Sequence, residues 1–151
     1  MVRLHTNRKG KSGSVKPYSK RVPEWFQTPK EEIIEVIIRL ARKGETTSKI
    51  GMHLRDTYGL GCVHSLTGKY ITEILEDAGI KAALPEDLHR LISKAVALRK
   101  HLSANTRDTT SKYQLRLVES KIYRISRYYK RKEKLPPKWR YDPEQAARLV
   151  S

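Results

Sequence analysis

The sequence predicts an all-α protein: a basic N-terminal extension, a small three-helix module, a long antiparallel helical hairpin and a short C-terminal helix. Apolar residues recur at the three- and four-residue steps of a helix, and glycine follows three of these segments. Proline or a short polar residue stands where several of the segments begin. We expect the extension at residues 1–27, the module at 28–80, the hairpin at 81–134 and the C-terminal tail at 135–151.

The N-terminal extension is rich in Gly, Ser, Lys and Arg and has neither a helical nor a strand period. We expect it to have no fold of its own in isolation. Trp25 and Phe26, at its end, are expected to anchor against the helical module. Tyr18 could either do the same or stack on bases.

The helical module is expected to begin at Thr28, with Thr28 as the N-cap, Pro29 at the first helical position and Glu31 completing a capping box. Gly44 would end this helix. The stripe predicted to be buried is Ile33, Ile34, Ile37, Ile38 and Ala41. Two more helices are expected, from about Thr47 to Tyr58 before Gly59 and from about Leu66 to Ala78 before Gly79.

The hairpin is predicted by two matching apolar seams. The fourth helix would start at Leu84–Asp87, where Pro85 and two acids suit a helix N-terminus. The fifth would be capped by Asp108 or a neighbour. The seams are Leu88, Leu91, Ala95, Leu98 and Leu102 on one helix, and Leu115, Val118, Ile122, Ile125 and Tyr129 on the other. Leu135-Pro136-Pro137 would end the fifth helix, and a short terminal helix would start at Asp142–Gln145.

The charge balance points to a polyanionic partner. The 32 Lys and Arg exceed the 16 Asp and Glu, giving a formal net charge of +16 and an isoelectric point near 10.1. Nucleic acid or an acidic membrane surface would suit such a field. The single Cys62 excludes an internal disulfide and a cysteine-based zinc site. The longest apolar stretch, Ile33 to Ala41, is too short to span a bilayer, and no secretory signal precedes it, so we expect a soluble intracellular protein.

Cations dominate the fifth helix outside its seam, and tyrosines are interleaved with them. Like charges at helical spacing destabilise a helix unless a polyanion relieves them, which favours phosphate binding over a merely solvated face. The candidate RNA-binding residues on this helix are Lys112, Arg116, Arg124, Arg127, Tyr128, Lys130 and Arg131.

The turn between the two long helices carries His101, Asp108 and Ser111. An A-form RNA minor groove is shallow enough for short polar side chains, and Asp108 could accept a hydrogen bond from a guanine amino group. Alternatively, Asp108 and Ser111 only cap the fifth helix and His101 is a passive surface residue. Spacing alone does not choose between these. No nucleophile or second acid stands nearby, so we expect no enzyme activity, and we expect no cofactor, metal site or small-molecule substrate.

The helices within residues 47–78 also resemble a helix-turn-helix, which would suit a DNA-binding regulator. Glu73, Glu76 and Asp77 on the expected recognition helix, against Lys69 alone, fit a phosphate-lined groove poorly. Protein contact or packing is the better interpretation of this module.

The segment His101-x6-Asp108-x2-Ser111, followed by Tyr128 and Arg131, resembles the signature of the small-subunit ribosomal protein of the universal fifteenth family. Further matches to the long archaeal and eukaryotic form are Thr67–Lys69, Leu84–Leu88, Ser120–Arg124, Arg127–Lys130 and Leu135–Trp139. The resemblance extends over essentially all 151 residues. Thr109-Thr110 depart from the bacterial pattern, which has a histidine pair there.

The resemblance implies a structural protein of the cytoplasmic ribosome that binds small-subunit ribosomal RNA at a three-way junction in the central domain and helps organise the platform of that subunit. Its partners would be that RNA, neighbouring ribosomal proteins and, at a further contact, large-subunit ribosomal RNA. His101, Asp108 and Ser111 would read a minor groove, and Tyr128 and Arg131 would lie against the junction. Arg124 and Lys94 would contact phosphates. We expect the N-terminal thirty residues to become ordered only on binding RNA.

Overall fold

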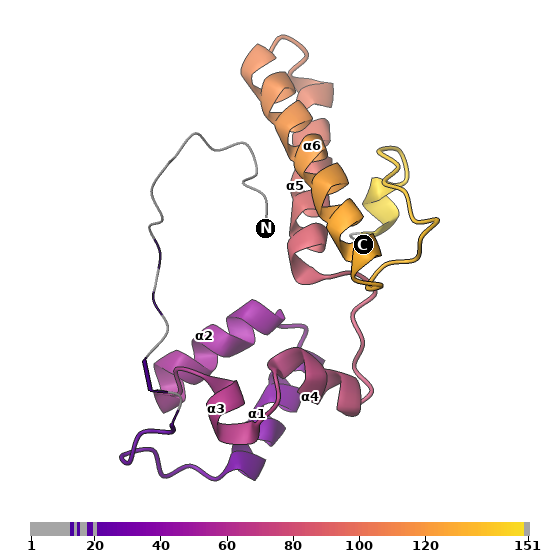
Figure 1. Ribbon diagram of the computed structural model, residues 1–151. Helices are drawn as coiled ribbons and strands as arrows, with labels where there is room; N and C mark the ends of the chain where they lie inside the picture. The colour runs from indigo at the N-terminus through magenta and orange to yellow at the C-terminus, as the bar shows by residue number, and fades with distance from the viewer. Residues whose placement is uncertain (1–12, 14, 16–17, 20, 150–151) are drawn as a thin grey trace. The chain divides into compact units, whose positions relative to one another are not determined.

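The computed structural model describes residues 13–149, except residues 14, 16, 17 and 20. Most of the expected N-terminal extension therefore lies outside the described residues. The described part contains six α-helices and one short 3-10 helix and no strand, which confirms the all-α fold class (Figure 1). The chain divides into two compact units, which meet in the sequence between Ala82 and Ala83.

The helical module contains α1 (Lys30–Arg42), α2 (Thr47–Tyr58), α3 (Val63–Thr67) and α4 (Ile71–Asp77). The second unit contains α5 (Glu86–Ala104), α6 (Thr109–Arg131) and the 3-10 helix η1 (Ala146–Leu149). None of the helices in the described part of the chain has the length and apolar character that a membrane span requires.

Helix α1 starts one residue later than expected. Its N-cap is Pro29, whose ψ of 151° is extended, and no side chain caps the helix, so the predicted N-cap at Thr28 and its capping box are wrong. Because the helical conformation begins only at Lys30, the Thr28 hydroxyl stands one residue too early to cap the first turn. Glu31 and Glu32 in that turn still suit the positive end of the helix dipole.

The buried face of α1 consists of Ile33, Val36 and Ile37. The predicted stripe included the two isoleucines but omitted Val36, while Ile34, Ile38 and Ala41 are only partly buried. The face turned toward the core is therefore rotated slightly from the one that the sequence period indicated.

Helix α2 has the predicted bounds because residues at both of its ends mark them. The Thr46 side chain accepts a hydrogen bond from the Lys49 backbone N–H at 3.4 Å, and Gly59 ends the helix with a φ of 70°. Phe26 packs against the module core, as expected. A Cβ on Gly59 would lie 3.0 Å from two indole carbons of Trp25, so Trp25 also contacts the module, although the residue as a whole is 64% exposed.

The expected third helix, Leu66 to Ala78, is wrong as a single element. Gly68 takes a left-handed φ of 75° and separates α3 from α4. Tyr70 then starts α4, and its backbone N–H donates to the Glu73 carboxylate at 2.7 Å. The module thus has four helices rather than three, and the continuous recognition helix that DNA binding required is not formed.

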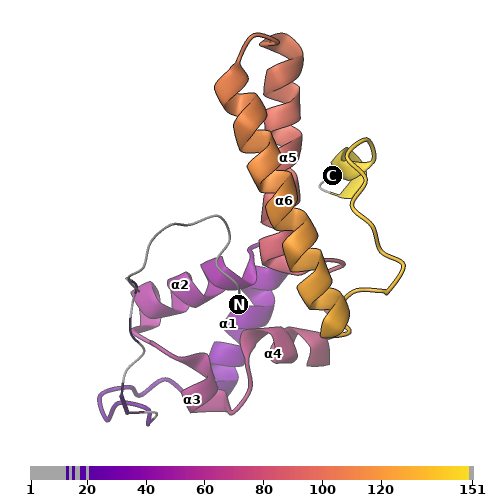
Figure 2. The ribbon, with the colours of Figure 1, turned by 45° about the horizontal axis from the view of Figure 1, so that its top comes forward.

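Helices α5 and α6 form the predicted antiparallel hairpin, as both ribbon views show (Figure 2). Val118, Ile122 and Ile125 are buried on α6, as the seam predicted. On α5 the buried residues are Leu88, Ile92 and Ala95, so Ile92 takes the central place expected for Leu91. Leu135, Tyr141 and Ala146 of the tail are buried in the same core, and the expected terminal helix is the single 3-10 turn η1.

Candidate nucleic-acid interface

The turn between α5 and α6 is closed by hydrogen bonds to Asp108. Its Oδ1 atom accepts from the Ser111 backbone N–H at 2.9 Å, which makes Asp108 the N-cap of α6. Its Oδ2 atom accepts from the Ser111 hydroxyl at 2.7 Å and faces His101 Nε2 at 2.9 Å. The Ser111 hydroxyl and backbone N–H, with His101, hold the pKa of the Asp108 carboxyl far below its usual range, so Asp108 is an anion at neutral pH.

Asn105 completes this network from the end of α5. Its side-chain nitrogen Nδ2 lies 3.1 Å from the His101 carbonyl oxygen and 3.3 Å from His101 Nδ1. Asn105 was not among the candidate residues that the sequence indicated, although its position four residues after His101 places both on one face of the helix end.

The structure brings His101, Asp108 and Ser111 together, as predicted. The capping role of Asp108 is confirmed, while reading of an RNA groove stays a prediction. The His101 and Asp108 side chains remain 46% and 31% exposed, so capping does not remove them from the surface. They border an open depression of about 380 Å³, lined also by Ala104, Asn105, Thr106 and Arg107.

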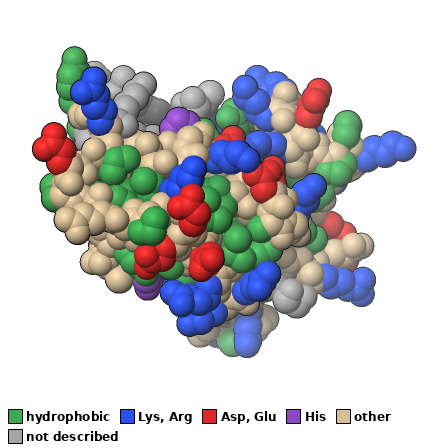
Figure 3. Space-filling model, turned by 90° about the horizontal axis from the view of Figure 1, so that it is seen from below, with side chains coloured by type: hydrophobic (Ala, Val, Ile, Leu, Met, Phe, Trp, Pro, Cys, Tyr) green, Lys and Arg blue, Asp and Glu red, His purple; other side chains and the backbone are tan. Residues whose placement is uncertain are grey.

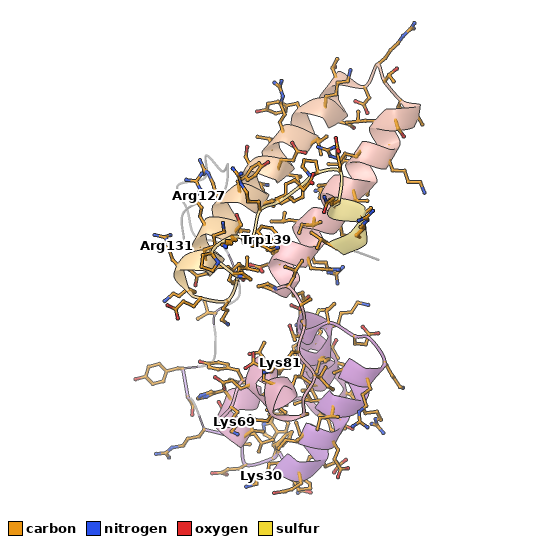
Figure 4. All side chains as sticks on the ribbon, turned by 90° about the vertical axis from the view of Figure 1, so that its right-hand side faces the viewer. Lys30, Lys69, Lys81, Arg127, Arg131 and Trp139 are labelled. Atoms are coloured by element: carbon orange, nitrogen blue, oxygen red, sulfur yellow. The ribbon has the colours of Figure 1, made fainter. Side chains whose placement is uncertain are left out.

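The outward face of α6 carries a row of arginines and tyrosines. At about 100° per residue, Arg116, Arg127 and Arg131 share one side of the helix, opposite the buried Val118 and Ile122. Figure 4 shows Arg127 and Arg131 pointing away from α5. None of these three arginines pairs with an acid among the described residues, so their charge is available to a ligand. Tyr113 and Tyr123 lie on the same face, 60% and 46% exposed.

The remaining predicted cations lie around this row. Lys112 and Arg124 are exposed and Lys130 is partly exposed. Lys94 is exposed on α5, two helical turns before His101 and on the same face of that helix. Lys94 therefore lies about 10 Å along α5 from His101, on a different helix from Arg116 and Arg127.

One acid of α6 does not oppose these cations, because it is used inside the hairpin. Glu119 Oε1 accepts a hydrogen bond from Arg99 Nη2 of α5 at 2.7 Å, and this bond raises the pKa of the Arg99 guanidinium. The pair links the two helices. Glu119 therefore leaves the positive charge of the outward face uncompensated.

A second group of candidates lies at the other end of α6. The Tyr129 hydroxyl donates to both carboxylate oxygens of Asp87, at 2.7 Å each, and joins the end of α6 to the start of α5. Burial, followed by the Asp87 hydrogen bond, raises the pKa of Tyr129. The neighbouring Tyr128 ring meets the Tyr129 ring edge-on at 5.3 Å, and Tyr128 and Arg131 face solvent. These two residues lie about 30 Å from Asp108 along the helix.

The helical module has a different surface. Its exposed acids are Glu31, Glu32, Glu35, Glu45, Asp56, Glu73, Glu76 and Asp77. Figure 3, a view from below, shows acidic side chains gathered among basic and apolar ones on the face toward the viewer. This mixture lacks the single sign of charge found on the outward face of α6.

Comparison with known proteins identifies the family of the chain. Residues 71–148 match the family model described as Ribosomal protein S15, and residues 1–60 match the Ribosomal S13/S15 N-terminal domain. The small ribosomal subunit protein uS15 of Caenorhabditis elegans is 48% identical over the full length of both chains. That of Methanospirillum hungatei is also 48% identical, over 100% of this chain and 99% of the relative. That of Hyperthermus butylicus is 52% identical over 95% of this chain and 89% of the relative. The chain therefore belongs to the uS15 family of small ribosomal subunit proteins, which confirms the resemblance of its sequence.

Proposed function

We propose that the protein is a structural constituent of the small ribosomal subunit and a primary binder of its ribosomal RNA at a three-way junction. The observation that carries this proposal is the α5–α6 hairpin, which joins a polar turn to an outward row of arginines that pair with no acid among the described residues. A role as a structural RNA binder rather than an enzyme agrees with the family to which the chain belongs.

The turn would read the minor groove of one RNA helix. The hydroxyl hydrogen of Ser111 is directed to Asp108, so the lone pairs of Ser111 Oγ remain free to accept. The guanine amino group is the donor that a base pair presents in the minor groove, and 2′-hydroxyl groups lie beside it. A guanine-containing groove is therefore the surface that best fits His101, Asp108 and Ser111.

The cations of α6 would bind the phosphates of the same RNA. We assign this role to Lys112, Arg116, Arg124, Arg127, Lys130 and Arg131, with Lys94 on α5 beside the turn. Tyr128 and Arg131 would meet the junction itself. Their distance of about 30 Å from the turn would let the hairpin contact one RNA helix with its turn and the junction with the other end of α6, so that a junction of the right geometry is preferred over an isolated duplex.

A position in the platform of the small subunit would bring further partners. The exposed acidic and basic side chains of the helical module would suit neighbouring ribosomal proteins, and a contact with large-subunit ribosomal RNA is part of the same proposal. We expect the basic N-terminal residues to order on binding RNA, and limited proteolysis of the protein with and without junction RNA measures this. If these residues resisted the protease equally well in the free protein and in the RNA complex, the expectation would be contradicted.

The binding proposal is tested by titrating the full chain onto a three-way-junction RNA from the small subunit at several salt concentrations. Arg127→Gln with Arg131→Gln should weaken binding and reduce the salt slope by roughly 0.7–0.9 for each phosphate that the variant no longer neutralises. Arg39→Gln with Arg42→Gln on α1 removes the same charge and should change the slope little. Ser111→Ala should weaken binding to guanine-containing RNA without changing the slope.

Two outcomes would count against the proposal. If the protein bound the junction no more tightly than a random duplex of equal length, junction RNA would not be its specific ligand. An equal reduction of the slope in the α1 double variant would mean that the α6 face holds no particular set of phosphates.

A further inference from the structure

We infer that Asn105 is a positioning residue that, together with Asp108, fixes the tautomer of His101 and thereby leaves Ser111 and Asp108 as hydrogen-bond acceptors toward RNA. The RNA part of this inference rests on the proposed function, while the tautomer is a property of the free protein. Neither Asn105 nor a tautomer was among the residues and roles that the sequence indicated.

The orientation of the Asn105 amide follows from one contact. Its side-chain Nδ2 lies 3.1 Å from the His101 carbonyl oxygen. A carbonyl oxygen only accepts hydrogen bonds, so the amide atom that faces it must be the nitrogen and not the oxygen. The flipped amide would place two acceptors against each other.

The tautomer of His101 follows from the same nitrogen. Asn105 Nδ2 is also 3.3 Å from His101 Nδ1, and an amide nitrogen only donates. Nδ1 must therefore accept, which places the imidazole hydrogen on Nε2. That hydrogen is then donated to Asp108 Oδ2 across 2.9 Å, so a single tautomer satisfies both contacts. In the other tautomer the Nδ1 hydrogen would face the amide hydrogens of Asn105, and the lone pair of Nε2 would face the Asp108 carboxylate.

The consequence is that the side-chain hydrogens of His101, Asn105 and Ser111 that these bonds use point into the network. His101 donates to Asp108, Ser111 donates to Asp108, and Asn105 donates to His101. What His101, Asp108 and Ser111 leave toward a ligand are acceptors, chiefly the lone pairs of Ser111 Oγ and one lone pair of Asp108 Oδ1. An acceptor surface selects groups that donate, and the guanine amino group is such a donor in the minor groove. Asn105 would thus contribute to base selection without touching the base.

The tautomer is tested on the full chain, labelled with ¹⁵N, by recording long-range ¹H–¹⁵N spectra of the histidine rings near pH 8, where imidazoles are mostly neutral. The His101→Gln variant identifies the His101 signals. In the wild-type protein we expect Nε2 to behave as the protonated nitrogen and Nδ1 as the unprotonated one.

Variants of Asn105 should change these signals in defined directions. Asn105→Ala should move the two nitrogen signals part of the way toward each other, because the Asp108 carboxylate still favours a hydrogen on Nε2 but the contact that favours an unprotonated Nδ1 is lost. Asn105→Asp should place a proton on Nδ1. Thr106→Ala, at the neighbouring exposed position, is the matched control and should leave them unchanged. Protonation of Nδ1 in the neutral wild-type ring, or unchanged signals in Asn105→Ala, would overturn the inference.

The effect on base selection is measured with junction RNA that carries either guanine or inosine, which lacks the amino group, at the contacted position. We expect the guanine preference of Asn105→Ala to fall by about five-fold, the equivalent of one neutral hydrogen bond, and that of Thr106→Ala to stay the same. An unchanged preference together with an altered tautomer would refute the role of Asn105 in selection. If the wild-type protein showed no preference for junction RNA, the proposed function would fail, and the ring spectra would still decide the tautomer.

Discussion

Replacing Tyr129 with phenylalanine tests the link between the two ends of the hairpin. The substitution removes only the hydroxyl that donates to both oxygens of Asp87, 42 positions away in the sequence. Tyr128→Phe is the matched control, because Tyr128 is exposed and donates no hydrogen bond to a described residue. Both variants keep the aromatic ring, and with it the edge-on packing of the pair.

The expected cost comes from one hydrogen bond to a charged acceptor. Such bonds contribute about 1.5–3 kcal/mol, but Asp87 is exposed and can bind water when the tyrosine hydroxyl is gone. We therefore expect Tyr129→Phe to lower the free energy of unfolding by about 1 kcal/mol. For a chain of this size that corresponds to a decrease of roughly 2–4 °C in Tm.

The same link predicts a dependence on alkaline pH. The folded protein holds the Tyr129 proton more tightly than the unfolded chain, whose tyrosines titrate near 10.0. The stabilisation is therefore present in full below pH 10 and is lost as the pH rises further. Thermal melts followed by circular dichroism should show the wild-type and Tyr129→Phe midpoints converging above about pH 10. Equal midpoints for Tyr129→Phe and Tyr128→Phe at neutral pH would refute the link.

Three further substitutions test the packing and backbone of both units. Gly59→Ala should destabilise the protein more than Gly79→Ala in urea melts. Both glycines have a positive φ, so an alanine at either position should cost about 1–2 kcal/mol of backbone strain. At Gly59 the added Cβ would also lie 3.0 Å from the Trp25 ring. Equal losses of stability in the two variants would mean that the Trp25 side chain moves aside without an energetic penalty. Glu133→Gly should stabilise the protein by about 0.5–1 kcal/mol in thermal melts. Glu133 has a left-handed φ of 57° after α6, a conformation that glycine adopts without strain. A decrease in stability would contradict this prediction. Ile122→Ala should cost about 3–4 kcal/mol in chemical denaturation, since Ile122 is fully buried, and a cost below about 1 kcal/mol would show that the hairpin core is not packed as described.

Local signals in the sequence predicted the helices whose ends they mark. Helix α2 was predicted at the right bounds with Gly59 as its stop, and the structure adds Thr46 as the cap of its first turn. The split at Gly68 was missed, because the apolar period continues across it and a glycine inside a periodic segment does not by itself reveal a positive φ. The cap of α1 was misplaced by a residue for a similar reason, since the sequence does not specify the ψ of Pro29.

The site was predictable to the extent that its contacts are local. Asp108 and Ser111 are three residues apart, and their cap was one of the two interpretations that the spacing allowed. The contact of Asn105 with His101 spans four residues and could have been predicted from the same helical spacing. By contrast, the bond between Tyr129 and Asp87 depends on how two long helices align, which no local pattern in the sequence specifies.

The turn between α5 and α6 also has a consequence for the order in which the chain folds. Its hydrogen bonds join residues three to seven positions apart, so they close a short loop at little entropic cost. Loops of this length close in well under a microsecond, and the two helices can then pair outward from the closed turn. The Tyr129–Asp87 bond, at the open end, would form last. A chain emerging from synthesis would therefore carry the completed turn before its C-terminal tail has docked, and RNA could be engaged while the rest of the hairpin is still closing.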